Sequence, residues 1–336
     1  MADSSKKIKL LFITQRINDQ DDDLAFVIQW IDEFIKNGID VQVICLWKGS
    51  FDNHFPVYSL GKENNLPKWR WILNFYKLIF SLKYTHVFVH MNPEWSALGG
   101  WYWRMTGRKF YLWYTHYTMT WYLRLTGWLA TNMFCATVQS LPQYSAPKKV
   151  VTGHGIDLSF WADAKGERIY SAKNILTVHR ICRSKRLEIV IKALLNLPVD
   201  YTLTIYGRDV ESDYADEMRA LVKELKITER VKFMGPLPAP ELKKIYPQYR
   251  LMVNMASETI DKTMLEAMLF GIFPVTTRAN SEAIGLSVYP ENDESATIAK
   301  FILDASWSQI GALELQQIVE ERHSLNSLIK KIIKYF

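Results

Sequence analysis

The sequence lacks the motifs of several large classes of nucleotide-binding and hydrolytic proteins. No GxGxxG follows the first predicted strand, and no GxxxxGK[ST] occurs anywhere in the 336 residues. These absences argue against a Rossmann dehydrogenase and against a P-loop nucleotide-binding protein. HExxH and GxSxG are also missing, so neither a zinc protease of that type nor an α/β-hydrolase is indicated. Any chemistry must be inferred from other residues.

Cysteine and long apolar runs are scarce as well. Cys45, Cys135 and Cys182 are widely spaced and form no CxxC pair, which favours reduced thiols over disulfides or a zinc site. The segment MADSSKKIKLLFI contains no apolar stretch of signal-peptide length. No uninterrupted apolar run reaches the length of a membrane-spanning helix. We therefore expect a cytoplasmic protein without a bound metal.

Acidic residues are nearly absent from one aromatic window, residues 66–128. It holds eight Lys or Arg residues, one acid and eight of the twelve tryptophans. Such a mixture is typical of a surface that rests on anionic lipid headgroups. It would also fit nucleic acid, or an aromatic core whose cations line the rim. All three interpretations remain open. We expect this window to contact an anionic membrane peripherally, at its inner face. We expect no nucleic acid among the partners.

Strand and helix patterns alternate through both halves of the chain. This alternation is typical of parallel sheets covered by helices on both faces. A composition change near residues 156–172 suggests a domain boundary. We expect domains at 1–155 and 156–318, with residues 319–336 returning to the first. The predicted strands are 8–14, 41–46, 85–90, 109–114, 132–138, 148–153, 174–179, 201–207, 230–235, 250–255 and 273–277.

Two glutamates eight residues apart stand out in SETIDKTMLEAMLFG. Glu258 follows a predicted strand, and Glu266 lies in the second turn of a helix that begins near Asp261, a good N-cap residue. The start of a helix offers unpaired N–H groups and a positive dipole end, which bind phosphate. A carboxylate one turn further in can accept hydrogen bonds from the two hydroxyls of a ribose. The spacing therefore fits a nucleotide diphosphate.

Two cations belong to the same predicted edge. Arg180 immediately follows a strand and Lys185 directly precedes a helix. Both lie on a strand-to-helix loop at the carboxyl edge of the sheet, where they could neutralise a diphosphate.

These segments together resemble the family 4 glycosyltransferases, which are retaining enzymes with the GT-B fold. The segments HRICRSK, LTIYG, VKFMG, the Glu258–Glu266 pair and EAMLFGIFPV occur in the order typical of that family's C-terminal domain. The resemblance covers roughly residues 150–277 and is weak in the N-terminal half. It implies an α/β fold of two Rossmann-like, doubly wound parallel-sheet domains facing a central cleft.

The resemblance also implies roles for single residues. Arg180 and Lys185 would hold the diphosphate and stabilise it as a leaving group, with Lys262 nearby. Glu266 would bind the ribose, Glu258 would lie against the transferred sugar, and backbone groups near Gly235 would border the base. In the N-terminal half, LWYTHYT makes His116 the candidate that contacts the sugar near the reacting carbon. Such enzymes need no metal or other cofactor.

Three departures from the family pattern concern the donor site. The usual glycine pair after the first strand is missing. Asp261 stands where the family has glycine, which places a negative charge near the proposed diphosphate, and Lys262 could offset it. Arg186 replaces the glycine that follows Lys185.

The sequence thus predicts a hexosyltransferase-type enzyme. It would move a sugar from a nucleotide diphosphate sugar to a hydroxyl of a glycan, either lipid-linked or close to a membrane. Two alternatives remain: a nucleotide-sugar epimerase or phosphorylase on the same fold, and a non-catalytic sugar-nucleotide-binding interaction module. His90, at the end of a predicted strand, suits a functional role or core packing equally.

Overall fold

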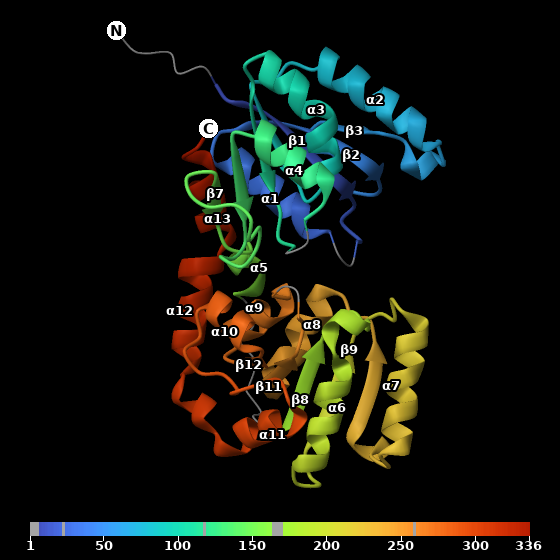
Figure 1. Ribbon diagram of the computed structural model, residues 1–336, viewed down its shortest axis with the longest axis vertical. Helices are drawn as coiled ribbons and strands as arrows, with labels where there is room; N and C mark the ends of the chain where they lie inside the picture. Colours follow the sequence, from blue (N-terminus) through green and yellow to red (C-terminus); the bar gives the residue numbers. More distant parts are fainter. Residues whose placement is uncertain (1–6, 22–23, 117–118, 163–170, 258–259) are drawn as a thin grey trace. The chain divides into compact units, whose positions relative to one another are not determined.

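The computed structural model describes residues 7–21, 24–116, 119–162, 171–257 and 260–336. The chain divides into two compact units, Met1–Gly155 with Leu325–Phe336 (unit 1) and Ile156–Ser324 (unit 2). Each unit is an α/β domain built on one parallel sheet (Figure 1).

Within the described residues, unit 1 has a seven-stranded sheet in the order β3-β2-β1-β4-β5-β6-β7. The strand bounds are β1 Lys9–Ile17, β2 Asp40–Lys48, β3 Val57–Ser59, β4 His86–His90, β5 Lys109–Trp113, β6 Asn132–Cys135 and β7 Lys149–Val151. The helix bounds are α1 Phe26–Lys36, η1 Lys62–Asn64, α2 Lys68–Ser81, α3 Pro93–Met105, α4 Trp121–Leu129 and α13 Leu325–Ile333.

Alternating side chains of β1 divide the core of unit 1 into two layers, because successive residues of a strand point to opposite faces. Leu10 and Phe12 pack with α1 and α13 on one face. Leu11 and Ile13 pack on the other face, which α2, α3 and α4 cover (Figure 1). The sheet is therefore buried on both sides.

The C-terminal segment joins unit 1 at Leu325, six residues later than expected. Residues 319–324 belong instead to unit 2 because α12 runs to His323, and Leu315 and Val319 are part of the unit 2 core. From Leu325 on, Leu328, Ile329 and Ile332 are fully buried in the unit 1 core.

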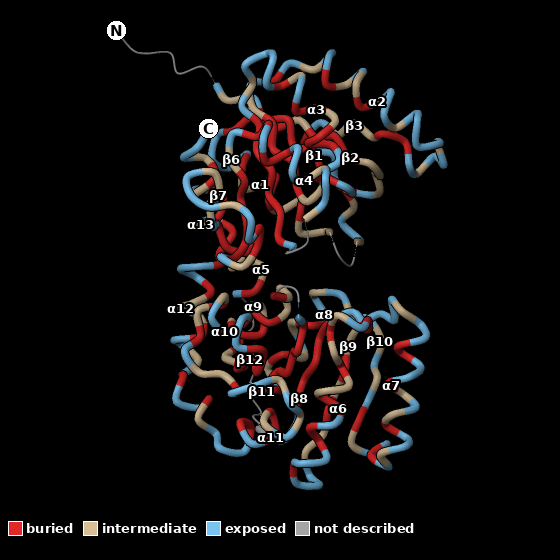
Figure 2. The backbone as a smooth tube through the Cα atoms, viewed as in Figure 1, coloured by how far each residue is buried: buried red, intermediate tan, exposed pale blue. Residues whose placement is uncertain are grey.

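Unit 2 has a five-stranded parallel sheet within the described residues, in the order β10-β9-β8-β11-β12. Its strands are β8 Ser171–Val178, β9 Thr202–Tyr206, β10 Val231–Gly235, β11 Tyr249–Asn254 and β12 Phe273–Thr276. Its α-helices are α5 Leu158–Trp161, α6 Leu187–Ala193, α7 Ser212–Glu224, α8 Ala239–Ile245, α9 Lys262–Leu269, α10 Arg278–Ile284, α11 Ser295–Asp304 and α12 Ala312–His323. Its 3-10 helices are η2 Arg183–Lys185, η3 Leu194–Asn196, η4 Thr228–Arg230, η5 Tyr246–Gln248 and η6 Ser306–Gln309. The central strands are buried (Figure 2).

The aromatic window divides between core and surface. Of its eight tryptophans, Trp95, Trp103 and Trp113 are buried and Trp71 is half-buried. Trp69, Trp101, Trp121 and Trp128 are exposed, and all four lie on α2, α3 or α4. The core interpretation therefore accounts for half of them. No helix of the described ranges is long and apolar enough to cross a bilayer.

Candidate active site

The candidate site of unit 2 lies where β8 and β11 adjoin. The chain order reverses between these two strands, and open parallel sheets bind ligands at the carboxyl edge of such a point. The loop after β8 and the loop after β11 are tied together there. The Ser257 amide donates to the Ser184 carbonyl oxygen over 3.1 Å, and the Thr263 hydroxyl of α9 donates to the Val178 carbonyl oxygen over 2.7 Å.

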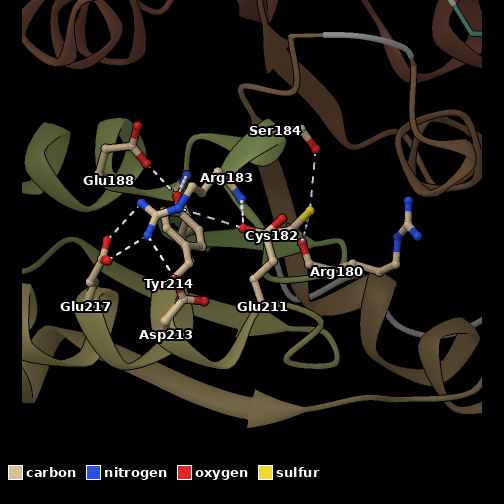
Figure 3. A network of polar contacts seen from close by, with 10 residues as sticks. Arg180, Cys182, Arg183, Ser184, Glu188, Glu211, Asp213, Tyr214 and Glu217 are labelled. Atoms are coloured by element: carbon tan, nitrogen blue, oxygen red, sulfur yellow. Dashed lines mark hydrogen bonds and ion pairs between the residues drawn. The ribbon is translucent and has the colours of Figure 1, made fainter.

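Four cations lie on the loop after β8, and their environments differ. Arg183 forms ion pairs with Asp213 and Glu217 of α7, at 3.2 and 2.6 Å, and covers the ring of Tyr214. Arg180 is exposed, and its guanidinium extends away from this network (Figure 3). Arg183 therefore ties the loop to α7, whereas Arg180 presents its charge to solvent.

Arg186 occupies the position where a glycine was expected. Its backbone is left-handed, with φ of 50°, a conformation that costs a non-glycine residue about 1 kcal/mol or more. The side chain compensates, since Nε donates to the Met255 carbonyl oxygen and an Nη donates to Asp293, both at 2.8 Å. The substitution thus fastens the loop after β8 to the end of β11.

Lys185 and Asp261 form an ion pair at the centre of the site. Lys185 Nζ lies 2.6 Å from Asp261 Oδ1, and Asn254 Nδ2 donates to Asp261 Oδ2 over 2.7 Å. The expectation that Asp261 caps α9 is wrong for its side chain. Asp261 occupies the N-cap position, but its carboxylate makes no cap hydrogen bond, because both oxygens bind Lys185 and Asn254.

Glu266 lies one turn after Lys262 on α9, and both side chains are half-buried. Burial raises the pKa of Glu266, although the Lys262 ammonium and the Tyr246 hydroxyl oppose the shift. Burial lowers the pKa of Lys262, although the negative charge of Glu266 opposes this shift. The pKa of Tyr246 is well above its usual value because of burial first and Glu266 second. Glu266 is therefore a confined carboxyl group whose polar neighbours are Lys262 and Tyr246.

Two glycines shape the neighbouring strand ends. A Cβ atom on Gly207, directly after β9, would lie 1.8 Å from the His179 carbonyl oxygen. Gly235 ends β10 with φ of 78°, a left-handed conformation that favours glycine. Its carbonyl oxygen accepts a hydrogen bond of 2.9 Å from the Gly207 amide. Close backbone approach explains the first glycine, and backbone conformation explains the second.

The remaining predicted residues lie elsewhere. Glu258 lies outside the described residues. His116 is an exposed residue of unit 1 that follows β5, with its ring 5.5 Å from that of Tyr114. His90 belongs to the core, since it is 1% exposed and stacks on Trp113.

Sequence reasoning missed three polar residues of the site: Asn254, Thr263 and Tyr246. Asn254 left a signal in the sequence, because it is a polar residue at the end of an apolar strand. The structure shows that it is fully buried. Buried polar side chains need partners, so an anchoring role could have been inferred for it.

The family model described as Glycosyl transferases group 1 matches residues 172–305 of the chain. This range contains every unit 2 side chain of the candidate site described above. No curated protein sequence matches the chain.

Solved structures show the same fold over nearly the whole length. Anabaena Alr3699/HepE in complex with UDP is 17% identical, with 97% of this chain and 99% of that chain covered and a TM-score of 0.77. Sucrose-phosphate synthase from Thermosynechococcus elongatus is 14% identical, with 98% of both chains covered and a TM-score of 0.76. UDP-GlcNAc 2-epimerase from Methanocaldococcus jannaschii is 13% identical, with 98% and 100% covered and a TM-score of 0.58. The chain has the GT-B fold of two parallel-sheet α/β domains.

Proposed function

We propose that the protein is a glycosyltransferase whose unit 2 binds a nucleotide diphosphate sugar at the β8–β11 edge. One observation carries this proposal: an exposed arginine, Arg180, and the start of α9 meet at the switch point of a sheet that matches a glycosyltransferase family model. Glu266 lies one turn into the same helix. Arg180 would bind the diphosphate, and Glu266 would accept hydrogen bonds from the ribose hydroxyls.

The proposed reaction is a metal-independent transfer that retains the anomeric configuration. The acceptor oxygen attacks the anomeric carbon while the bond from that carbon to the diphosphate oxygen breaks. The proton of the acceptor hydroxyl passes to the leaving oxygen. Arg180 and the N–H groups at the start of α9 stabilise the developing negative charge. Glu258 and His116 contact the transferred sugar, and backbone groups near Gly235 border the base.

The test of the donor site is thermal unfolding against UDP, GDP, ADP, CDP and dTDP, first without metal and then with magnesium. A ligand at a hundred times its dissociation constant adds about 2.7 kcal/mol, which moves the melting temperature of a domain of this size by several degrees. We expect one nucleotide to stabilise the protein without metal. Glu266→Ala should reduce that shift in melting temperature. With the 2′,3′-dideoxy form of the nucleotide, the shift should differ far less between wild type and Glu266→Ala. If none of the five nucleotides raises the melting temperature, the result would favour the non-catalytic interaction module.

The GT-B fold alone does not separate transfer from epimerisation, because an epimerase shares it. Incubating the selected sugar nucleotide without acceptor distinguishes the two, since only an epimerase converts the donor into an isomeric sugar nucleotide. Transfer predicts an unchanged donor, or slow hydrolysis to the free sugar with its original anomeric configuration. Accumulation of an isomerised sugar nucleotide would reject the transferase proposal.

The acceptor side of the proposal concerns one surface of unit 1, which we call the aromatic face. Three helices carry it, and contacts join them in a layer. The Tyr76 hydroxyl of α2 donates to the Leu98 carbonyl oxygen of α3, and Arg104 of α3 covers the Trp128 ring of α4. The exposed apolar residues of the aromatic face are Trp69, Ile72, Leu73, Phe80, Trp101, Met105, Trp121, Leu125 and Trp128.

Charge complementarity supports an anionic lipid surface as the partner of the aromatic face. Its exposed cations are Lys68, Arg70, Lys77, Arg104 and Arg124. Tryptophans and arginines together suit the boundary between headgroups and acyl chains. A lipid-linked glycan acceptor would then be reached by an enzyme that rests on the bilayer at its cytoplasmic surface.

Sedimentation with vesicles of phosphatidylglycerol and phosphatidylcholine tests this contact. We expect wild type to bind anionic vesicles and to lose part of the binding in high salt. The double variant Trp121→Ser/Trp128→Ser should bind less at every salt concentration. Leu313→Ser, which removes an exposed apolar residue of unit 2, is the matched control. Equal binding by all three proteins, or binding to neutral vesicles alone, would reject the proposal.

A further inference from the structure

The Lys185–Asp261 ion pair removes a positive charge from the candidate donor site. Lys185 is 4% exposed, and its only ion pair in the described part of the chain is with Asp261 at 2.6 Å. Burial by itself would raise the pKa of Asp261, but Lys185, His179 and the hydrogen bond from Asn254 hold that pKa below its usual value. The carboxylate is therefore charged at neutral pH, and the pair as a whole is neutral.

The other cations of the loop do not replace the lost charge. Arg183 is paired with α7 and Arg186 with Asp293. Burial lowers the pKa of His179, so its imidazole is neutral at pH 7. Arg180 makes no ion pair among the described residues. Among the described cations of this loop, only Arg180 is thus free to bind a diphosphate at the β8–β11 edge. The next cation, Lys262 at the start of α9, acts on the Glu266 carboxylate.

Asp261 repels each phosphate charge, so its effect grows with the charge of the ligand. A nucleotide diphosphate sugar carries two phosphate charges, whereas the nucleoside diphosphate that remains after transfer carries a third on its terminal phosphate above a pH of about 6. The leaving product is therefore repelled more strongly than the incoming donor.

We propose that Asp261 is a specificity-determining residue of the donor site that competes with the ligand for Lys185 and favours release of the nucleoside diphosphate over the sugar nucleotide. This inference rests on the proposed function. It predicts that Asp261 weakens the binding of both ligands, and that of the product more. The first contact with the diphosphate then falls to Arg180.

Calorimetric titration of wild type and Asp261→Asn with uridine, UDP and UDP-glucose tests the inference. We expect Asp261→Asn to bind UDP at least tenfold more tightly, which corresponds to about 1.4 kcal/mol. The gain for UDP-glucose should be smaller, and uridine should bind equally to both proteins. A purely structural role of Asp261 would change all three ligands alike. Asp261→Asn places a side-chain amide against the amide of Asn254. Asp261→Gly removes the side chain altogether and therefore serves as a second variant.

A double-mutant cycle isolates the competition for Lys185. Lys185→Met should weaken UDP binding sharply, because it leaves Asp261 beside the ligand without its counter-ion. The double variant Lys185→Met/Asp261→Asn should recover at least tenfold of that loss. Circular dichroism at the titration temperature confirms that each variant is folded.

The outcomes separate this inference from the proposed function. UDP binding by wild type without tightening in Asp261→Asn and Asp261→Gly would overturn the role of Asp261 alone. Equal tightening for UDP and UDP-glucose would overturn the preference for product release. If no protein of the series binds any nucleotide of the panel, the donor site itself is rejected, and the inference with it.

Discussion

The closest backbone approach in the candidate site gives a prediction whose magnitude follows from the structure. In Gly207→Ala the new Cβ would lie 1.8 Å from the His179 carbonyl oxygen, where ordinary contacts begin at 3.4 Å. The two strand ends must therefore separate by roughly 1.6 Å. That shift strains two hydrogen bonds, from the His179 amide to the Tyr206 carbonyl at 3.1 Å and from the Ile181 amide to the Arg208 carbonyl at 2.9 Å.

Overpacking costs about 1–3 kcal/mol, and each lost hydrogen bond about 1 kcal/mol. We therefore expect Gly207→Ala to lower the free energy of unfolding of unit 2 by about 3–5 kcal/mol. For a domain of this size the melting temperature should fall by about 10 °C. The loop that carries Arg180 begins at the displaced carbonyl, so nucleotide binding should weaken as well.

Scanning calorimetry measures the first effect, and hydrogen exchange of the β8 and β9 amides localises it. Gly235→Ala is the matched control. Its Cβ meets nothing within 4 Å, but its φ of 78° is left-handed, so it should cost only about 1–2 kcal/mol. If Gly207→Ala proves no more destabilising than Gly235→Ala, the close approach is not a constraint on unit 2 and the reasoning fails.

Two further predictions concern unit 1. Ile329 lies on the fully buried face of α13, so Ile329→Ala should lower the free energy of unfolding by about 2–5 kcal/mol, measured by urea titration. Lys330→Ala, at an exposed position of the same helix, should leave that free energy nearly unchanged. Equal effects of the two substitutions would contradict the packing of α13. Burial lowers the pKa of His54, but Asp32 and Asp52 outweigh it and hold that pKa above its usual value. Stability from His54 is therefore full below a pH of about 6.5 and is lost as pH rises through the raised pKa. The melting-temperature difference between wild type and His54→Gln should be larger at acidic than at alkaline pH, and a reversed order would refute it.

The sequence was a sound guide to the order of strands and helices, because their signals are local. Alternating apolar residues and helix-breaking segments are visible within a window of a few residues. Thus the predicted strand at residues 250–255 is observed as Tyr249–Asn254, and that at 109–114 as Lys109–Trp113. The strand β3, Val57–Ser59, is not among the predicted strands.

Placement of Arg180, Lys185 and Glu266 on one sheet edge was also predictable in outline. Strand-to-helix loops of a parallel sheet all lie at the carboxyl ends of its strands. Which loops are neighbours, however, depends on strand order, and no local pattern encodes it. The distinction between core and surface tryptophans in the aromatic window was likewise hidden, because both kinds occur within the same short segments.

By itself the sequence determined the α/β class, the strand-and-helix alternation and the residue types available at the candidate site. Only the tertiary structure decided how those residues are used. Placing β8 beside β11 brings Lys185 to Asp261, 76 residues away. Packing of α11 against α6 brings Arg186 to Asp293, 107 residues away. A cation read from the sequence as a ligand for phosphate is thereby engaged by a carboxylate of the chain. The physical reason is that the strength of a charge depends on what surrounds it, and those surroundings exist only once distant segments have packed together.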